Sequence, residues 1–356
     1  MLMAKMANQQ LVTASHQLTK EDKYYCPACQ KGVHLKQGAV MRPHFAHFKA
    51  EACAAFSEGE TAEHLEGKVQ LREWLERLNI RVEMEAYLPE LKQRPDLLVV
   101  TDERKIAIEF QCSGIAVEKV EERTRGYRQA GIEVVWVLGE QLAASKKLTA
   151  FQKACLTNVK GELLLFHYSV KKKRLEYWGD FQLTQKGQMQ SQRKFLFKDS
   201  RLRIEKMEKP GKRQRVNMEI EYQKMMRQFY GEQLREFQAI LYEKGETHIS
   251  LPKEVYVRCS HEWMIGDHPL EWKMAFIWWL EEFGVRTVLT ERKIREWAKQ
   301  LTYHTMPQVT EEQRLRPVME FIEILTEAGV LKRFRLDKWT LIEYPKRFKN
   351  LEEKLK

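Results

Sequence analysis

The sequence contains no long apolar run. Its longest uninterrupted apolar stretch, Met274 to Leu280, has seven residues, whereas a helix that crosses a bilayer needs roughly 20. The opening residues, MLMAKMANQQ, include no apolar stretch of signal-peptide length. The sequence therefore predicts no transmembrane helix, and we expect a cytoplasmic protein.

Cysteine is also scarce, with six cysteines in 356 residues. This number is too small for a disulfide framework and fits a reducing compartment. Cys112, Cys155 and Cys259 stand apart from one another in the sequence, and we interpret them as buried or free thiols. The sequence also has no internal repeat and no low-complexity tract.

The composition is that of a basic protein of two or three domains. The formal net charge is +11, and hydrophobic residues make up 43% of the chain, enough for well-formed cores. A basic excess favours a polyanionic partner, although charge alone would suit DNA, RNA or a membrane surface equally.

Much of the basic excess lies in one region. Between Ser191 and Arg227 there are 12 Lys or Arg residues against 5 Asp or Glu. Pro210-Gly211 interrupts this region, so Lys212, Arg213 and Arg215 are predicted in an exposed loop or a helix start. They are candidates for DNA contact, and a solubilising linker is an equally good interpretation.

The most informative segment is RPDLLVVTDERKIAIEFQCS, residues 94 to 113. Asp96 begins one apolar strand, and a polar turn leads into a second strand in which Glu109 and Gln111 alternate with apolar residues. Asp96 and Glu109 can then converge on one Mg²⁺ or Mn²⁺ ion, as in a metal-dependent nuclease. The alternative is an ordinary turn with Glu109 in solvent, but the apolar run VVWVL at 134 to 138 indicates a sheet covered on both faces.

A third carboxylate is predicted on the helix over residues 61 to 78, with Thr61 as its N-cap. Glu63 lies at the edge of the packed face, and Lys68 lies one turn after His64. Gly67 has no side chain, so it would let a phosphate backbone or the neighbouring sheet approach. A solvated Glu63 and a core-edge His64 are the alternative.

The helix predicted after Gln111 carries basic residues next to this centre. Arg123 and Tyr127 recur four residues apart and suit a phosphate backbone. Glu118, Glu121 and Glu122 could instead pair with the basic residues of a solvated helix.

The N-terminal segment contains a second candidate metal site. A tight CxxC, Cys26 and Cys29, is followed by His44, His47 and Cys53. We predict a structural Zn²⁺ site made of Cys26, Cys29, His47 and Cys53, with His44 competing for the third place. A redox CxxC is the rival, but such a motif opens a helix within a βαβ unit.

These motifs occur in an order that resembles the PD-(D/E)xK nuclease superfamily and, more narrowly, the competence protein CoiA family. The resemblance spans most of residues 24 to 140. It is carried by CPAC at 26 to 29, RPHFAHF at 42 to 48, EGETAEHLEGK at 58 to 68, LPELKQRPDLL at 88 to 98, IAIEFQCS at 106 to 113 and GIEVVWVLG at 131 to 139.

The resemblance implies a cytoplasmic factor of natural transformation that acts on incoming DNA, single-stranded or branched, before or during recombination. It implies catalytic roles for Glu63, Asp96, Glu109 and Gln111. Gln111 stands where the superfamily usually has a lysine; an amide can hold a water but brings no positive charge. Lys68 is a candidate substitute for that charge.

Two functional hypotheses follow. The first is a metal-dependent deoxyribonuclease of the PD-(D/E)xK type with Gln in place of Lys. The second is a DNA-binding recombination accessory that does not cleave and whose C-terminal domain recruits a recombinase or other competence proteins.

The predicted architecture is an α/β restriction-endonuclease-like core with an N-terminal zinc-binding module and a C-terminal, mostly α-helical domain. We place the zinc module at residues 1–58, the nuclease-like domain at 59–180 and the basic C-terminal domain at 181–356. Within the last, helices are predicted over Val216 to Tyr242, Pro269 to Phe283 and Pro317 to Ala328. Trp278 and Trp279 could stack bases, but their helical spacing is more typical of core residues.

Overall fold

The computed structural model describes residues 1–48, 53, 60–143, 147–184, 186–196, 222–224, 226 and 231–355. The chain forms two compact units. Unit 1 comprises Met1–Asp180, Gln192–Lys206 and Thr305–Val309, and unit 2 comprises Phe181–Ser191, Met207–His304 and Thr310–Lys356. None of the described helices is long and apolar enough to cross a membrane.

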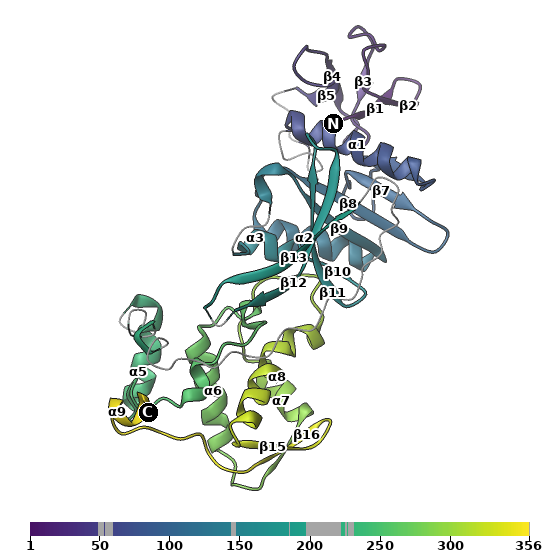
Figure 1. The fold of residues 1–356 in the computed structure, drawn as a ribbon. Helices are drawn as coiled ribbons and strands as arrows, with labels where there is room; N and C mark the ends of the chain where they lie inside the picture. The colour runs from purple at the N-terminus through teal and green to yellow at the C-terminus, as the bar shows by residue number, and fades with distance from the viewer. Residues whose placement is uncertain are drawn as a thin grey trace. The chain divides into compact units, whose positions relative to one another are not determined.

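Unit 1 begins with a small antiparallel sheet of order β2-β1-β3-β4-β5 (Figure 1). Its strands are β1 (Met3–Met6), β2 (Leu11–Thr13), β3 (Tyr24–Tyr25), β4 (Gly32–Lys36) and β5 (His44–His47). Val33, Leu35 and Phe45 form a small core with Cys26 and Cys53. So few apolar residues stabilise a sheet only modestly, and a bound metal would add to that stability.

The larger sheet of unit 1 has the order β13-β12-β11-β9-β8-β7-β6, with β10 added beside β11. The β8–β9 and β9–β11 pairs are parallel. The strands are β6 (Val82–Met84), β7 (Leu97–Val100), β8 (Lys105–Gln111), β9 (Ile132–Leu138), β10 (Thr157–Val159), β11 (Glu162–Ser169), β12 (Arg174–Leu183) and β13 (Met189–Leu196). The helical segments of this part are α1 (Ala62–Arg77), α2 (Val117–Gln129), η1 (Glu140–Leu142) and α3 (Ala150–Ala154).

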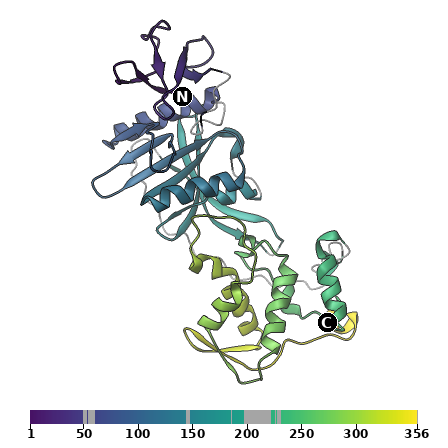
Figure 2. The same cartoon turned by 180° about the vertical axis from the view of Figure 1, so that it is seen from behind.

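Strand β8 is covered on both faces, as the apolar run at residues 134 to 138 predicted. Phe110 packs under α1 at Gly67, where an added Cβ would lie 2.1 Å from the Phe110 ring. Glu109 faces the opposite side and contacts α2, which lies across the sheet in the view of Figure 2. Gly67 was predicted to let either a phosphate backbone or the neighbouring sheet come close to α1. The structure shows the sheet at this position.

Local predictions in this region are confirmed. Strands β7 and β8 form an antiparallel hairpin, and the side chain of Thr61 accepts a hydrogen bond from the backbone N–H of His64, 3.1 Å away, as the N-cap of α1. Cys112, Cys155 and Cys259 are buried, and none of them forms a disulfide with another described cysteine.

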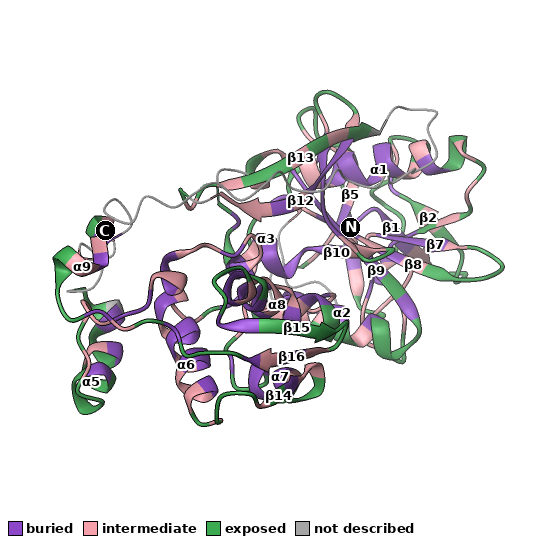
Figure 3. Cartoon of the chain, turned by 60° about the horizontal axis from the view of Figure 1, so that its bottom comes forward, coloured by how far each residue is buried: buried purple, intermediate pink, exposed green. Residues whose placement is uncertain are grey.

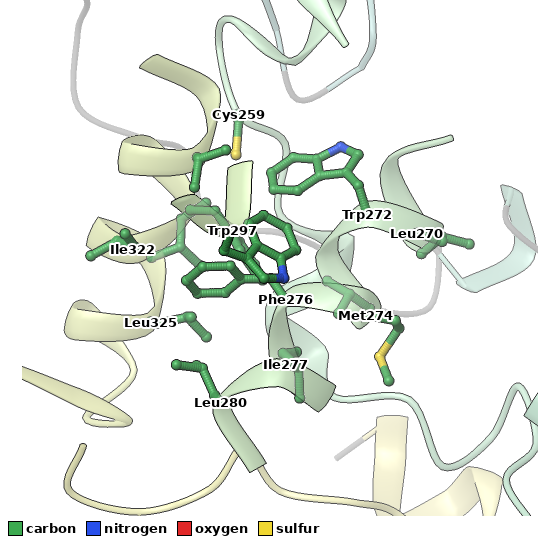
Figure 4. Packing of buried hydrophobic residues seen from close by; sticks show 14 of the residues in the cluster. Cys259, Leu270, Trp272, Met274, Phe276, Ile277, Leu280, Trp297, Ile322 and Leu325 are labelled. Atoms are coloured by element: carbon green, nitrogen blue, oxygen red, sulfur yellow. The ribbon is translucent and has the colours of Figure 1, made fainter. Parts of the chain in front are cut away.

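Unit 2 packs helices against a three-stranded sheet of order β14-β16-β15, which the sequence did not predict. Figure 4 shows part of its apolar core, where Phe276 and Trp297 meet edge to face, their ring centroids 4.7 Å apart. The elements are η2 (Glu232–Leu234), α5 (Arg235–Glu243), η3 (Lys253–Tyr256), η4 (Glu262–Met264), α6 (Pro269–Glu281), β14 (Val288–Thr290), α7 (Glu291–Ala298), α8 (Glu311–Glu327), β15 (Leu331–Arg335), β16 (Lys338–Leu341) and α9 (Leu351–Leu355).

The helix predicted over Pro269 to Phe283 is confirmed as α6, and Trp278 and Trp279 pack against the core. The start predicted at Pro317 is wrong, because α8 begins six residues earlier. Its N-cap is Thr310, and Pro317 lies inside the helix. A proline at a helix start is the commoner arrangement, so the sequence pattern misplaced this boundary.

Candidate nuclease centre and metal site

Asp96 lies directly before β7, and one of its two oxygens accepts two hydrogen bonds. Its Oδ2 atom accepts hydrogen bonds from the backbone N–H of Phe110 at 2.9 Å and from His64 Nε2 at 3.1 Å. Burial alone would raise the pKa of Asp96, but the charges of His64 and Lys68 hold that pKa below its ordinary value. Asp96 is therefore an ionised carboxylate at neutral pH.

Lys68 is fully buried and lies among three carboxylates. Its Nζ atom is 2.6 Å from Glu60 Oε1, 2.6 Å from Glu85 Oε1 and 3.6 Å from Asp96 Oδ1. Burial favours the neutral amine, but these carboxylates raise the pKa of Lys68 above its ordinary value. Lys68 thus carries a positive charge beside Asp96. It is the residue that was predicted as a candidate substitute for the lysine usual at the position of Gln111.

Glu85 completes this network, and the sequence reasoning missed it. Its carboxylate accepts hydrogen bonds from the backbone N–H groups of Leu2 and Met3 and from Arg94 Nη1, at 2.9 to 3.0 Å. Burial opposes ionisation, but Arg94 and Lys68 hold the pKa of Glu85 well below its ordinary value. The network therefore ties the first strand of the N-terminal sheet to the candidate centre.

Glu109 is 5% exposed and lies under α2. Its Oε1 atom accepts hydrogen bonds from Arg123 Nη2 and from the Tyr127 hydroxyl. Burial raises the pKa of Glu109, although Arg123 and Tyr127 act in the opposite direction. A buried carboxylate on a doubly covered strand needs such partners.

Arg123 and Tyr127, the two residues of α2 that were predicted to bind phosphates, both contact Glu109. Tyr127 is fully buried, so its side chain faces Glu109 and not solvent. Arg123 keeps 21% of its side-chain surface exposed while it pairs with Glu109. Lys212, Arg213 and Arg215 lie outside the described residues.

Glu63 and Gln111 lie near the ends of their elements. Glu63 Oε1 accepts a hydrogen bond from the backbone N–H of Glu140 at 2.8 Å, just beyond β9. Gln111 is half-buried at the end of β8 and shares the sheet face of Glu109.

Asp96 and Glu109 supply the hard oxygen donors that Mg²⁺ and Mn²⁺ prefer. Within the described residues, however, Glu63, Asp96 and Glu109 do not form a group of three ligands within 4.8 Å of one another. Two carboxylates are a donor set that could hold such a cation, with waters and phosphate oxygens completing its coordination.

The N-terminal sheet brings together the four predicted metal ligands. The ligand atoms of Cys26, Cys29, His47 and Cys53 all lie within 4.8 Å of one another, and Cys29 Sγ is 3.3 Å from His47 Nε2. A tetrahedral Zn²⁺ site with Zn–S bonds of about 2.3 Å has ligands at such separations. Three thiols and an imidazole are thus a donor set that could hold zinc.

The structure also decides between the two histidines of β5. Both lie on the same strand, but His44 Nδ1 lies 2.9 Å from the carbonyl oxygen of Arg42, whereas His47 joins the cysteines. The two cysteines of the CxxC lie in the turn that follows β3, where the backbone N–H of Gln30 donates to the carbonyl of Cys26. The site is a closed metal knuckle in form, without the helix that a redox CxxC would open.

A mixed sheet covered by helices, with buried carboxylates beside a lysine, defines unit 1 as a nuclease-like α/β unit that carries an N-terminal module with a Cys/His group able to hold a metal. Comparison with known proteins agrees. Residues 60–211 match the nuclease-like domain of competence protein CoiA, and residues 7–56 match the N-terminal domain of the same protein.

The chain is also similar to competence protein CoiA of Bacillus subtilis (strain 168), with 38% identity over 124 residues. That alignment covers 35% of this chain and 33% of the relative's length. No solved structure is significantly similar to the chain. The protein belongs to the competence protein CoiA family, and the resemblance inferred from the sequence motifs is confirmed.

Proposed function

We propose that this protein processes incoming transforming DNA by metal-dependent phosphodiester hydrolysis, before or during recombination. The observation that carries the proposal is the pair of carboxylates, half-buried Asp96 and buried Glu109, within the segment that matches a nuclease-like domain. Buried ionisable groups with perturbed pKa values are concentrated at functional sites.

In this proposal Asp96 and Glu109 hold Mg²⁺ or Mn²⁺, and Glu63 serves as an auxiliary ligand or base. A divalent cation would neutralise charge on the phosphate and lower the pKa of its bound water toward about 7. Gln111 orients the attacking water through its amide, and Lys68 supplies positive charge beside Asp96, from 3.6 Å. Zn²⁺ at Cys26, Cys29, His47 and Cys53 has a structural role.

Arg123 has a second part in the proposal. Its guanidinium holds Glu109, and 21% of its side-chain surface is exposed, so it can approach a phosphate oxygen. The substrate is DNA, single-stranded or branched, and the protein acts in the cytoplasm. Lys212, Arg213 and Arg215 are further candidates for backbone contact.

A second candidate function is a DNA-binding recombination accessory that does not cleave and that recruits a recombinase. Two observations favour it. Gln111 replaces the usual lysine, and the Oε1 atom of Glu109 is already engaged by Arg123 and Tyr127. Both features reduce the electrostatic activation available to an attacking water.

The experiment that separates the two uses a naturally transformable host that lacks its own protein of this family. The host is complemented with the wild type, Asp96→Ala, Glu109→Ala or the control Glu133→Ala, which removes an exposed carboxylate from β9. The hydrolytic proposal expects transformation to be lost in the first two variants and kept in the control, with DNA binding by the purified proteins unchanged. Transformation at the wild-type level in Asp96→Ala and Glu109→Ala would refute hydrolysis and favour the accessory role.

A further inference from the structure

The second half of unit 2 has the element order helix, strand, helix, helix, strand, strand. These elements are α6, β14, α7, α8, β15 and β16 (Figure 3). Strand β16 lies between β14 and β15, and both pairs are antiparallel. This order and this strand arrangement are those of a winged helix-turn-helix domain, in which the final hairpin forms the wing.

The β15–β16 hairpin is strongly basic and faces solvent. In the segment LKRFRLDK, residues 331 to 338, four basic residues stand against the single acid Asp337. Lys332, Arg333 and Arg335 are exposed, and Lys338 is half-buried. In Figure 3, β15 is drawn buried at its start and exposed along the rest.

Among the described residues, three of these cations, Lys332, Arg335 and Lys338, form no ion pair with a carboxylate. Arg333 acts within the hairpin, since its guanidinium donates to the carbonyl oxygen of Leu336 at 2.7 Å. Arg333 therefore fixes the hairpin turn and leaves the other three cations for a partner.

The tip of the hairpin exposes apolar side chains between the cations. Phe334 is 65% exposed and Leu336 is 83% exposed. The Arg335 guanidinium lies 5.6 Å from the centre of the Phe334 ring. DNA-binding proteins contact the sugars and base edges of a groove with aromatic and apolar side chains that alternate with Arg and Lys.

Helix α8 is not suited to the same contact. In helix-turn-helix proteins the second helix of the motif lies in the major groove. Here the exposed positions of α8 include Glu312, Glu323 and Glu327, which phosphates would repel. The charge distribution therefore assigns the nucleic-acid contact to the hairpin.

We propose that the β15–β16 hairpin is a DNA-binding wing that grips a duplex. Lys332, Arg335 and Lys338 contact the phosphates, and Phe334 and Leu336 enter the groove. A two-stranded ribbon fits a DNA groove in width. The inference rests on the proposed function for its choice of DNA as partner, and it adds a binding site outside the nuclease-like domain.

The test measures binding of the full-length protein to fluorescent duplex and single-stranded DNA by anisotropy, across a range of salt concentrations. Every protein carries Asp96→Asn and no divalent cation is added, so the duplex stays intact. The wing variant is Lys332→Ala/Arg335→Ala/Lys338→Ala. A matched control, Arg235→Ala/Arg292→Ala/Lys349→Ala, removes three exposed positive charges elsewhere in unit 2.

Loss of one phosphate contact reduces the slope of log K against log salt by about 0.9 for duplex DNA. The wing variant should therefore bind duplex more weakly, with a slope shallower by roughly 2.7, while the control keeps the slope of its parent. An unchanged slope in the wing variant, an equal change in the control, or a loss confined to single-stranded DNA would each overturn the proposal.

A second variant tests the apolar tip. Phe334→Ala should weaken duplex binding without changing the salt slope, because it removes no charge, and Tyr242→Ala, 86% exposed on α5, should have no effect. Equal affinities for Phe334→Ala and its parent would refute groove entry by the ring. These results do not depend on whether the nuclease-like centre cleaves DNA, so the failure of either proposal can be recognised separately.

Discussion

Replacing Gly67 by alanine tests how closely α1 packs on the strand that carries Glu109. A Cβ built at residue 67 would lie 2.1 Å from Phe110 Cε1 and 2.7 Å from Cζ, whereas ordinary van der Waals contact begins near 3.4 Å. The Phe110 ring is 1% exposed, so it has no open space into which it could turn.

Two effects of opposite sign decide the result. Alanine is a better helix former than glycine by about 1 kcal/mol. Overpacking a close-packed core costs about 1–3 kcal/mol, and an overlap with a buried aromatic ring belongs at the upper end of that range. We therefore expect Gly67→Ala to destabilise unit 1 by about 2 kcal/mol.

Hydrogen–deuterium exchange of peptides from α1 and β8 measures this change where it occurs. Gly114→Ala is the control, because a Cβ at residue 114 meets nothing within 4 Å, and its effect should stay within about 0.5 kcal/mol. Phe110→Leu should cost less in the Gly67→Ala background than in the wild type, because the smaller side chain relieves the overlap. Additive effects, or a Gly67→Ala protein as stable as the wild type, would refute the packing argument.

Three further predictions concern buried charge and metal. Lys68→Met should destabilise unit 1 by about 3–5 kcal/mol in urea unfolding, because it removes the buried cation that lies 2.6 Å from both Glu60 and Glu85; an unchanged midpoint would contradict this. Because the pKa values of Glu85 and Asp96 lie below their ordinary values, their ionisation stabilises the fold above the unfolded pKa of about 4, and unfolding midpoints should fall as pH drops below that value. A midpoint that rises on acidification would be inconsistent with these ion pairs. His47→Ala should lose bound zinc by elemental analysis whereas His44→Ala keeps it, and the reverse pattern would show that the ligand is misassigned.

The sequence predicted those parts of the fold that depend on neighbouring residues. The strand alternation at Ile106 to Gln111, the Thr61 cap and the hairpin between β7 and β8 all depend on local periodicity and turn chemistry. The presence of both His44 and His47 left the zinc ligand open, because only the tertiary arrangement shows which ring meets the cysteines.

Long-range partners could not be predicted. Glu85 bonds to Leu2, 83 positions away, and no local pattern marks that pair. Arg123 and Tyr127 have the helical spacing of a phosphate-binding face, yet the fold turns both toward Glu109. The signal that could have suggested this was Glu109 itself, because a buried carboxylate needs hydrogen-bond donors on the covering helix. The exposed basic strand β15 was missed because KRFR lacks the alternation of a half-buried strand.

In the proposed function, Asp96 and Glu109 together support metal-dependent hydrolysis. The most direct measurement is digestion of end-labelled single-stranded, duplex and branched DNA with Mg²⁺ or Mn²⁺, comparing the wild type with Asp96→Asn, Glu109→Gln and the surface control Glu133→Gln. We expect cleavage by the wild type and the control and none by the other two proteins. DNA that all four proteins bind and leave intact would contradict hydrolysis and point to the accessory role.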